Sequence, residues 1–332
     1  MRILIIAPVP RGSTRGNRIT ADRWQSLLRQ LGHDVEIAED YQPGNDVDCL
    51  IALHARHSHP SIVRFRQEKP AAPVIVCLTG TDLHVDFDPQ NRRSNDSQKS
   101  ANYLAVEQSL DAADQIVFLE PEGQKKLNHR WQDKCHVILQ SAEPVHPDPP
   151  ASDCFLVTVV GHLRPIKDPF RTAEAARLLP DDSRIRVLHI GKALSDAMRR
   201  QAETETRNNP RYQWIGPVTH GQALQKLAGS HLTVLSSINE GAPSVISEAV
   251  VNRVPVLASR IDASIGLLGP NYPGLFEVGD TQQLAELMLR AESNSDFLRK
   301  LEAAVEKLIP RFSKSRELDA LNIVLNSSSS LG

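Results

Sequence analysis

Short apolar runs alternate with amphipathic stretches along almost the whole chain, and this alternation constrains the fold most strongly. It predicts parallel strands joined by crossover helices, in sheets that are covered on both sides. The alternation stops at a proline-rich segment, residues 143–150, and then restarts. We therefore expect an α/β protein of two doubly wound, Rossmann-like domains joined by an extended linker. The expected strands are residues 2–8, 34–39, 49–53, 74–78, 115–119, 136–139, 154–160, 185–190, 212–215, 232–235, 256–258 and 275–278.

The expected domain boundaries follow from this pattern. Residues 1–145 form the first domain, 146–152 the linker and 153–312 the second domain, while 313–332 form a C-terminal helix and tail. In the first domain, a helix with Trp24, Leu27 and Leu28 on one face should end at Gly32. The final helix is expected from Lys314 to about Leu325, with the serines that follow it frayed.

Composition narrows the class of protein. The net charge of −2 gives no reason to expect a nucleic-acid or acidic-membrane partner. No window approaches the ~20 apolar residues that span a bilayer, and the apolar run at residues 4–7 is too short for a signal peptide. The four cysteines are widely spaced, as buried thiols in a reducing compartment would be. We expect a cytoplasmic protein without a membrane partner.

Two glutamates, Glu240 and Glu248, lie eight residues apart between an apolar run and a helical pattern. Strand, glycine turn and helix is the context in which a helix N-terminus faces a ligand. Two carboxylates about two helical turns apart suit a ligand with hydroxyls at both ends, such as a nucleotide sugar. The alternative is that both are ordinary solvated carboxylates. The turn between them consists of Gly241, Ala242, Pro243 and Ser244.

Loops that follow strands of the first domain carry many polar residues. The first, residues 8–18, combines two glycines with three arginines and opens a helix, a composition suited to binding an oxyanion. Its glycines are four residues apart, which does not fit an NAD site. Two further loops contain His54 and Asp82, the better site candidates among their residues. His54, His57 and His59 invite a metal interpretation, but no acidic or thiol ligand accompanies them, and we expect no metal.

The spacing of Glu240 and Glu248 resembles the E-x7-E segment of retaining transferases of glycosyltransferase family 4, which have the GT-B fold. The resemblance implies two Rossmann-like domains facing a central cleft, a final helix that returns to the first domain, and catalysis without a metal. It implies that Glu240 contacts the donor sugar and Glu248 the nucleotide ribose. A Gly-Arg-Leu segment followed by Lys supplies two cations to the donor diphosphate in that family. Here Lys167 keeps its place, His162 stands where the arginine is expected, and Arg164 follows two positions later.

Several segments look more specifically like the selenosugar synthases of selenoneine biosynthesis. They are Gly12–Trp24, Ala52–Arg56, Leu78–Asp82, Leu139–Ser141 and Gly161–Pro169, the last with that subfamily's own Gly-His-Leu-Arg. The resemblance implies transfer of a sugar, N-acetylglucosamine, from a UDP-sugar to selenophosphate, giving a 1-seleno-sugar. No further cofactor is implied. The implied functional neighbours are a selenophosphate synthetase and a selenoneine synthase.

This resemblance assigns a role to each candidate residue. The catalytic set is Arg164, Lys167 and Glu240. The donor-binding set is Gly12, Gly241, Ala242, Pro243, Ser244 and Glu248. The acceptor-binding set is Arg15, Asn17, Arg18, His54, Arg56, Thr81 and Asp82. The rival interpretations are a family 4 transferase with an oxygen acceptor and a non-catalytic UDP-sugar-binding protein. Whether His162 or Arg164 is the second diphosphate ligand stays open. So do the preference among donor sugars, the anomeric outcome, the residue that would cleave the Se–P bond and the oligomeric state.

Overall fold

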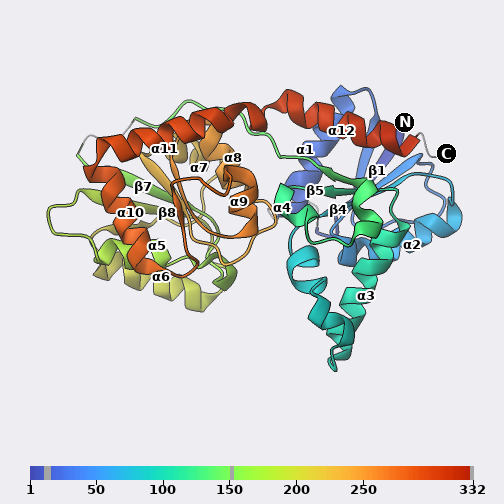
Figure 1. The fold of residues 1–332 in the computed structure, drawn as a ribbon, viewed down its shortest axis with the longest axis horizontal. Helices are drawn as coiled ribbons and strands as arrows, with labels where there is room; N and C mark the ends of the chain where they lie inside the picture. Colours follow the sequence, from blue (N-terminus) through green and yellow to red (C-terminus); the bar gives the residue numbers. More distant parts are fainter. Residues whose placement is uncertain (11–15, 150–152, 330–332) are drawn as a thin grey trace. The chain divides into compact units, whose positions relative to one another are not determined.

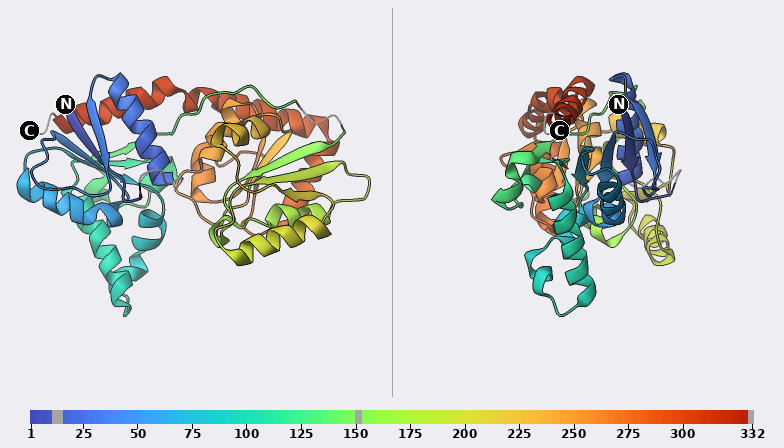
Figure 2. Two further views of the ribbon diagram at one scale, coloured as in Figure 1. Left: turned by 180° about the vertical axis from the view of Figure 1, so that it is seen from behind. Right: turned by 90° about the vertical axis from the view of Figure 1, so that its right-hand side faces the viewer.

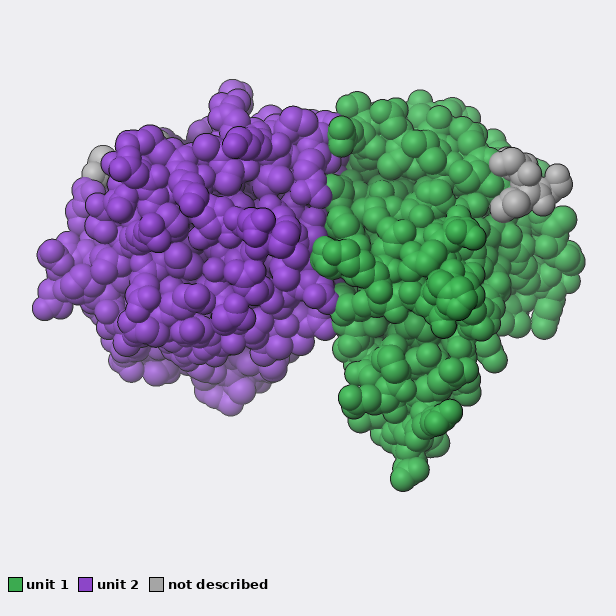
Figure 3. All heavy atoms as spheres, viewed as in Figure 1, with its two compact units in different colours: residues 1–140, 315–332 green, residues 141–314 purple. Residues whose placement is uncertain are grey.

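The computed structural model describes residues 1–10, 16–149 and 153–329, and the chain divides into two compact units (Figure 3). Unit 1 contains residues 1–140 and 315–332, and unit 2 contains residues 141–314. Each unit has one six-stranded sheet in which every strand pair is parallel (Figure 1). Two Rossmann-like α/β domains are therefore confirmed.

The sheet of unit 1 has the strand order β2-β1-β3-β4-β5-β6. Its central strands β3 and β4 are buried along their whole length, as strands covered on both faces must be. The strands are β1 Arg2–Ile6, β2 Asp34–Ala38, β3 Cys49–Leu53, β4 Val74–Leu78, β5 Gln115–Phe118 and β6 Cys135–Val137. The helices are α1 Gly16–Gln30, α2 Ala55–Glu68, α3 Ser97–Ala112, α4 Pro121–Gln124 and α12 Lys314–Ser329.

Helix α1 packs with Trp24, Leu27 and Leu28 buried, which is the face that the sequence predicts. It ends at Gln30, and Gly32 follows with φ of +85°, a backbone conformation that glycine adopts without strain. The indole Nε1–H of Trp24 donates to Oε1 of Glu317 at 3.1 Å, and both side chains are buried. This bond joins α1 to α12, two helices far apart in sequence that lie side by side in Figures 1 and 2.

The sheet of unit 2 has the strand order β12-β11-β10-β7-β8-β9. Helices α5 and α10 pack together in this unit, and α8 packs against α11 (Figure 1). The strands are β7 Phe155–Val160, β8 Ile185–Ile190, β9 Tyr212–Trp214, β10 Leu232–Leu235, β11 Val256–Ser259 and β12 Leu275–Phe276. The helices are α5 Arg171–Arg177, α6 Asp196–Asn208, α7 His220–Ala228, α8 Ser244–Val251, α9 Asp262–Leu268, α10 Thr281–Ser293 and α11 Ser295–Leu308.

Each sheet has one point at which the chain reverses the direction in which it adds strands. In unit 1 this point lies between β1 and β3, and in unit 2 between β7 and β10. Ligands of such folds bind at the carboxyl ends of the two strands that flank the reversal. The fold therefore singles out the loops after β1 and β3 in one unit and the loops after β7 and β10 in the other.

All twelve predicted strands occur, and the differences are confined to their ends. Strand β1 stops at Ile6 because the chain turns there, with the N–H of Val9 bonding to the carbonyl of Ala7. Helix α12 runs to Ser329, past its expected end near Leu325, so the expectation that the serines fray from residue 327 is wrong for those that are described. Ser328 lies within the helix, and its Oγ donates to the Val324 carbonyl at 2.8 Å. Within the described residues, no helix has the length and apolar character needed to cross a membrane.

Candidate active site

Two loops of unit 2 meet at the carboxyl ends of β7 and β10. The loop after β7 contains a short 3-10 turn, η4 Pro165–Lys167, and the loop after β10 leads into α8. The N–H of Ile238 donates to the carbonyl of Ile166 at 2.9 Å, and Oγ of Ser236 donates to the carbonyl of Asp168 at 2.9 Å. These bonds fix one loop against the other beside a pocket. Its lining includes Gly161, His162, Lys167, His189, Ser236 and Ser237.

Lys167 and Glu240 form an ion pair between these loops, from Nζ to Oε1. Both side chains are largely withdrawn from solvent, with 20% of Lys167 and 10% of Glu240 exposed. The hydroxyl of Ser237 also donates to Oε1 of Glu240, at 2.7 Å. An ammonium and a carboxylate are thus held together at the reversal point, where they can bind an anionic group and a hydroxyl group respectively.

Five of the six residues predicted to bind the donor follow Glu240 in the chain. Gly241, Ala242 and Ser244 are partly buried and Pro243 is buried, in the turn that opens α8. Glu248 lies on α8 with 6% of its surface exposed. Its Oε1 is 3.9 Å from Nε2 of His220, a side chain at the start of α7 that is 70% exposed.

His162 and Arg164 occupy different surroundings in the loop after β7. His162 lines the pocket and is half-buried, whereas Arg164 is exposed. Burial lowers the pKa of His162, and the nearby positive charges of Lys167, Arg164 and Lys192 lower it further. The backbone N–H of Lys192 donates to Nδ1 of His162 at 3.2 Å, so the neutral ring carries its proton on Nε2.

A buried polar network beneath the pocket was not predicted from the sequence. Burial lowers the pKa of His189 to about 4, so its ring is neutral. Nε2–H of His189 donates to the carbonyl of Gly161 at 3.2 Å, and Nδ1 accepts from the hydroxyl of Tyr212 at 2.9 Å. Gly191 lies against the same loop, where a Cβ would be 2.0 Å from the Gly161 oxygen. A histidine within the apolar run 185–190 was the one sequence signal for this network.

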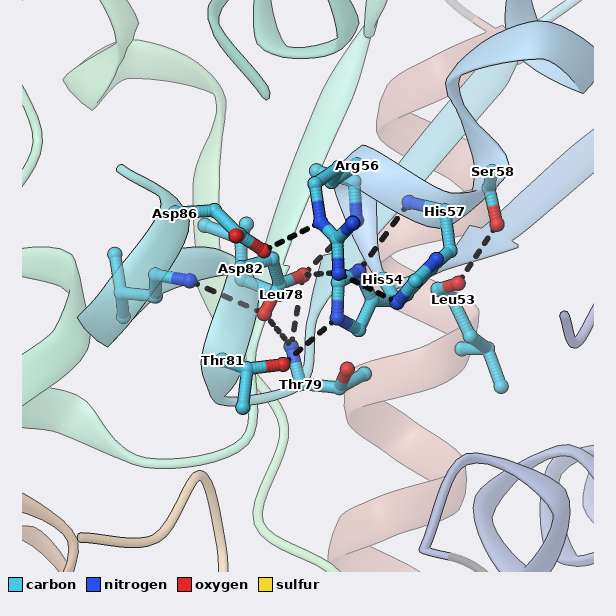
Figure 4. A network of polar contacts seen from close by, with 12 residues as sticks. Leu53, His54, Arg56, His57, Ser58, Leu78, Thr79, Thr81, Asp82 and Asp86 are labelled. Atoms are coloured by element: carbon cyan, nitrogen blue, oxygen red, sulfur yellow. Dashed lines mark hydrogen bonds and ion pairs between the residues drawn. The ribbon is translucent and has the colours of Figure 1, made fainter. Parts of the chain in front are cut away.

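Asp82 organises the corresponding edge of unit 1 (Figure 4). Its side chain is fully buried, and its Oδ1 accepts backbone N–H bonds from Thr79, Gly80 and Leu83 at 2.9–3.2 Å. Its Oδ2 accepts the N–H of Ala55, the first residue of α2, at 2.9 Å. The carboxylate therefore joins the loop after β4 to the loop after β3, and it satisfies the first N–H of α2.

His54 is also occupied by contacts within this network (Figure 4). Its Nδ1 accepts the N–H of His57 at 3.3 Å, which caps α2, and its Nε2 donates to Oγ1 of Thr81 at 2.9 Å. The backbone of His54 has φ of +71°, a conformation that is strained for a residue with a side chain. His54 is buried, whereas Thr81 and His57, the two residues to which its ring is hydrogen-bonded, are exposed at the surface of this edge.

The two predicted acceptor cations that the structure describes, Arg18 and Arg56, are paired with carboxylates. Arg56 donates from Nε to Oδ2 of Asp86 at 2.7 Å, and Arg18 forms an ion pair with Asp22 one turn along α1 at 2.9 Å. Asn17 is half-buried in the first turn of α1. Gly12 and Arg15 lie outside the described residues.

The histidines of this edge do not form a metal site. Among the residues that the structure describes, no three His, Cys, Asp or Glu side chains come together as metal ligands. His57 accepts a hydrogen bond on Nε2 from Arg56 at 2.8 Å, and His59 contacts Oγ of Ser109 at 3.0 Å. Burial lowers the pKa of His57, and the nearby positive charge of Arg56 lowers it further.

Comparison with known proteins shows which family part of the chain is similar to. Residues 146–308 match the model of the family described as glycosyl transferases group 1. The chain is 30% identical over 140 residues to TuaC of Bacillus subtilis (strain 168), which is named as a teichuronic acid biosynthesis glycosyltransferase. That match covers 42% of this chain, and the chain spans a third (33%) of the length of that relative.

Two solved structures are similar over nearly the whole chain. Sucrose-phosphate synthase (tll1590) from Thermosynechococcus elongatus superposes with a TM-score of 0.79 at 16% identity, covering 100% of both chains. Anabaena Alr3699/HepE in complex with UDP has a TM-score of 0.74 at 17% identity, covering 98% of this chain and 100% of its own. At these identities the likeness shows the fold, which is GT-B. The chain has this fold, and its residues 146–308 match the glycosyl transferases group 1 family.

Proposed function

We propose that the protein is a glycosyltransferase that uses no metal ion. It transfers a sugar, N-acetylglucosamine, from a UDP-sugar to the selenium of selenophosphate, and the product is a 1-seleno-sugar. The observation that carries the transferase function is the Lys167–Glu240 pair, which lies at the strand reversal of the family-matched unit. We assign the donor to the domain of residues 153–312 and the acceptor to that of residues 1–145. The identity of the acceptor rests on the resemblance of the loop motifs to selenosugar synthases.

The donor half of the reaction follows from the chemistry of the pair. As the bond between the sugar C1 and the diphosphate oxygen breaks, its electron pair stays on the oxygen, and a fixed cation stabilises the charge that develops. Lys167 supplies that cation. Glu240 would accept a hydrogen bond from a hydroxyl group of the sugar, and Glu248 would accept hydrogen bonds from the ribose hydroxyl groups. UDP is the nucleotide in the HepE complex, and it is the nucleotide that we assign here.

The acceptor half requires a site for an anion. The N–H groups of Ala55 and His57 at the start of α2 already bond to Asp82 and His54, whereas α1 begins at Gly16 directly after the arginine-containing loop. The N-terminus of a helix favours the binding of an anion. Selenophosphate is already anionic and its selenium is a soft nucleophile, so the transfer needs no strong general base. Positioning is then the main task of this unit.

The substitution Arg18→Ala should affect the binding of selenophosphate but not that of the UDP-sugar. Loss of a charge-assisted hydrogen bond, about 1.5–3 kcal/mol, should raise the KM for selenophosphate by roughly 10- to 100-fold and leave the KM for the UDP-sugar almost unchanged. Arg29→Ala is the matched control, because Arg29 lies at the other end of α1 and bonds to the carbonyl of Val35. Equal effects of Arg18→Ala on both substrates would contradict the acceptor assignment.

The similarity to TuaC favours a second candidate, a group 1 transferase with an oxygen acceptor. Release of UDP from UDP-N-acetylglucosamine distinguishes the candidates when phosphate, thiophosphate and selenophosphate are compared as acceptors. Our proposal expects the fastest release with selenophosphate, because phosphate has a similar charge but lacks the soft nucleophile. Release that none of the three anions stimulates, but that a sugar hydroxyl does, would support the second candidate. Binding of UDP without turnover would indicate a non-catalytic binding protein.

A further inference from the structure

We propose that His162 binds the diphosphate of the donor and gains a proton when that diphosphate arrives. This proposal rests on the proposed function, since it requires a nucleoside diphosphate in the pocket of unit 2. It gives a role to the histidine that stands where the resembling transferases carry arginine. The residue would then act as a cation only when the anion is present.

The position of the ring is set by contacts on both sides of its loop. Its Nδ1 accepts the N–H of Lys192, from the segment after β8, and its neighbour Gly161 is held through its carbonyl by His189. His162 lines the pocket together with Lys167. With Nδ1 occupied, Nε2–H is the ring's group for a ligand, and no hydrogen bond joins it to another described residue.

The charges around the ring decide its state in the free protein. Lys167 and Arg164 from its own loop and Lys192 from the loop after β8 are cations near the ring, and partial burial acts in the same direction to lower the pKa of His162. His189 from β8 is neutral, and Glu240, from the loop after β10, is paired with Lys167. The ring is therefore neutral at pH 7 before the donor binds.

A bound diphosphate reverses this balance. Its negative charge offsets the three cations and favours the protonated ring, which raises the pKa of His162 on binding. Because the complex then holds more protons than the free protein, affinity must increase as the pH falls. Each unit by which the pKa rises corresponds to a tenfold gain in affinity across the titration. An arginine at this position stays charged, so the affinity for the donor would not depend on pH in this way.

Calorimetry of UDP-N-acetylglucosamine binding to the full chain, without acceptor, tests the proposal. Titrations at pH 7 in two buffers of different ionisation enthalpy measure proton uptake directly, and the donor's diphosphate diester has no group of its own that titrates there. The wild type should take up a fraction of a proton and bind more tightly at pH 6 than at pH 8. His162→Gln keeps a hydrogen-bond donor but should lose the uptake, and His162→Arg should bind at all these pH values without uptake.

His231→Gln is the matched control. His231 is a half-buried histidine of the same unit that also accepts a backbone N–H on Nδ1, from Leu156 at 3.0 Å, and its pKa is also lowered by burial. It lies at the opposite ends of β7 and β10, so this variant should keep the proton uptake of the wild type.

The outcomes separate the proposal from the function on which it rests. Uptake lost in His162→Gln and kept in His231→Gln supports the proposal. Donor binding with no uptake in the wild type, or with equal uptake in His162→Gln, overturns it while leaving the transferase function intact. Should His162→Gln fail to fold, undiminished uptake in His162→Arg overturns the proposal. A wild type that binds neither UDP-N-acetylglucosamine nor UDP overturns both.

Discussion

Asp82→Asn tests whether the carboxylate at the edge of unit 1 organises its loops rather than contacting a substrate. The amide keeps one acceptor oxygen but places an NH2 donor where the second carboxylate oxygen stood. If the amide oxygen faces Thr79, Gly80 and Leu83, the buried N–H of Ala55 meets a donor instead of an acceptor. A hydrogen bond to a charged group contributes about 1.5–3 kcal/mol, and an unsatisfied buried N–H costs about 1–3 kcal/mol. We expect unit 1 to lose roughly 3 kcal/mol of its free energy of unfolding.

Urea unfolding measured by tryptophan fluorescence gives this free energy. The chain has three tryptophans, of which Trp24 and Trp131 lie in unit 1, so a Trp214→Phe background makes the signal specific to that unit. Asp96→Asn is the matched control in the same background. Asp96 also accepts backbone N–H bonds at a helix start, but it is exposed, and asparagine caps helices equally well. We expect its effect to stay within about 0.5 kcal/mol.

A loss below about 0.5 kcal/mol for Asp82→Asn would refute this reasoning, because the carboxylate would then not be needed by the surrounding backbone. An unchanged stability together with a raised KM for selenophosphate would mean that Asp82 binds the acceptor directly.

Two further substitutions test the donor site. Lys167→Ala should lower kcat about 10²- to 10³-fold, the loss typical of removing one group that stabilises a developing anion, while Lys226→Ala, which removes the partner of Asp148, should leave kcat unchanged. Steady-state kinetics decide this, and similar losses in both variants would contradict the assignment. Glu248→Gln should raise the KM for the UDP-sugar by roughly tenfold or more without changing the KM for selenophosphate, and a KM for the UDP-sugar within twofold of wild type would exclude a ribose contact.

Most of the strands were predictable because they are short apolar runs whose neighbours are helical or turn-forming. Their order in the sheets was not, since nothing local decides that β7 lies between β8 and β10. The predictions were least accurate at strand ends, where β6 begins at Cys135 instead of residue 136 and β12 stops at Phe276. Edge strands have one partner strand, so the ladder that fixes their length is weakest.

The contacts that define the candidate site are long-range, which explains why the sequence could name residues but not their partners. The spacing of Glu240 and Glu248 identified the donor loop, yet the pairing of Glu240 with Lys167 joins loops that are more than seventy residues apart. The roles of His54 as a helix cap and of Asp82 as a backbone acceptor depend on the meeting of two βα loops. Only the parallel sheet brings those loops together.

Mass spectrometry of the reaction products tests the proposed transfer of a sugar to selenophosphate. The purified protein is incubated in metal-free buffer with selenophosphate and a panel of UDP-sugars. We predict a product with the isotope envelope of selenium that forms together with UDP, requires both substrates, and is most abundant with UDP-N-acetylglucosamine. Release of UDP without any selenium-containing product, or no turnover with any member of the panel, would contradict the assignment of this protein as a selenosugar-forming transferase.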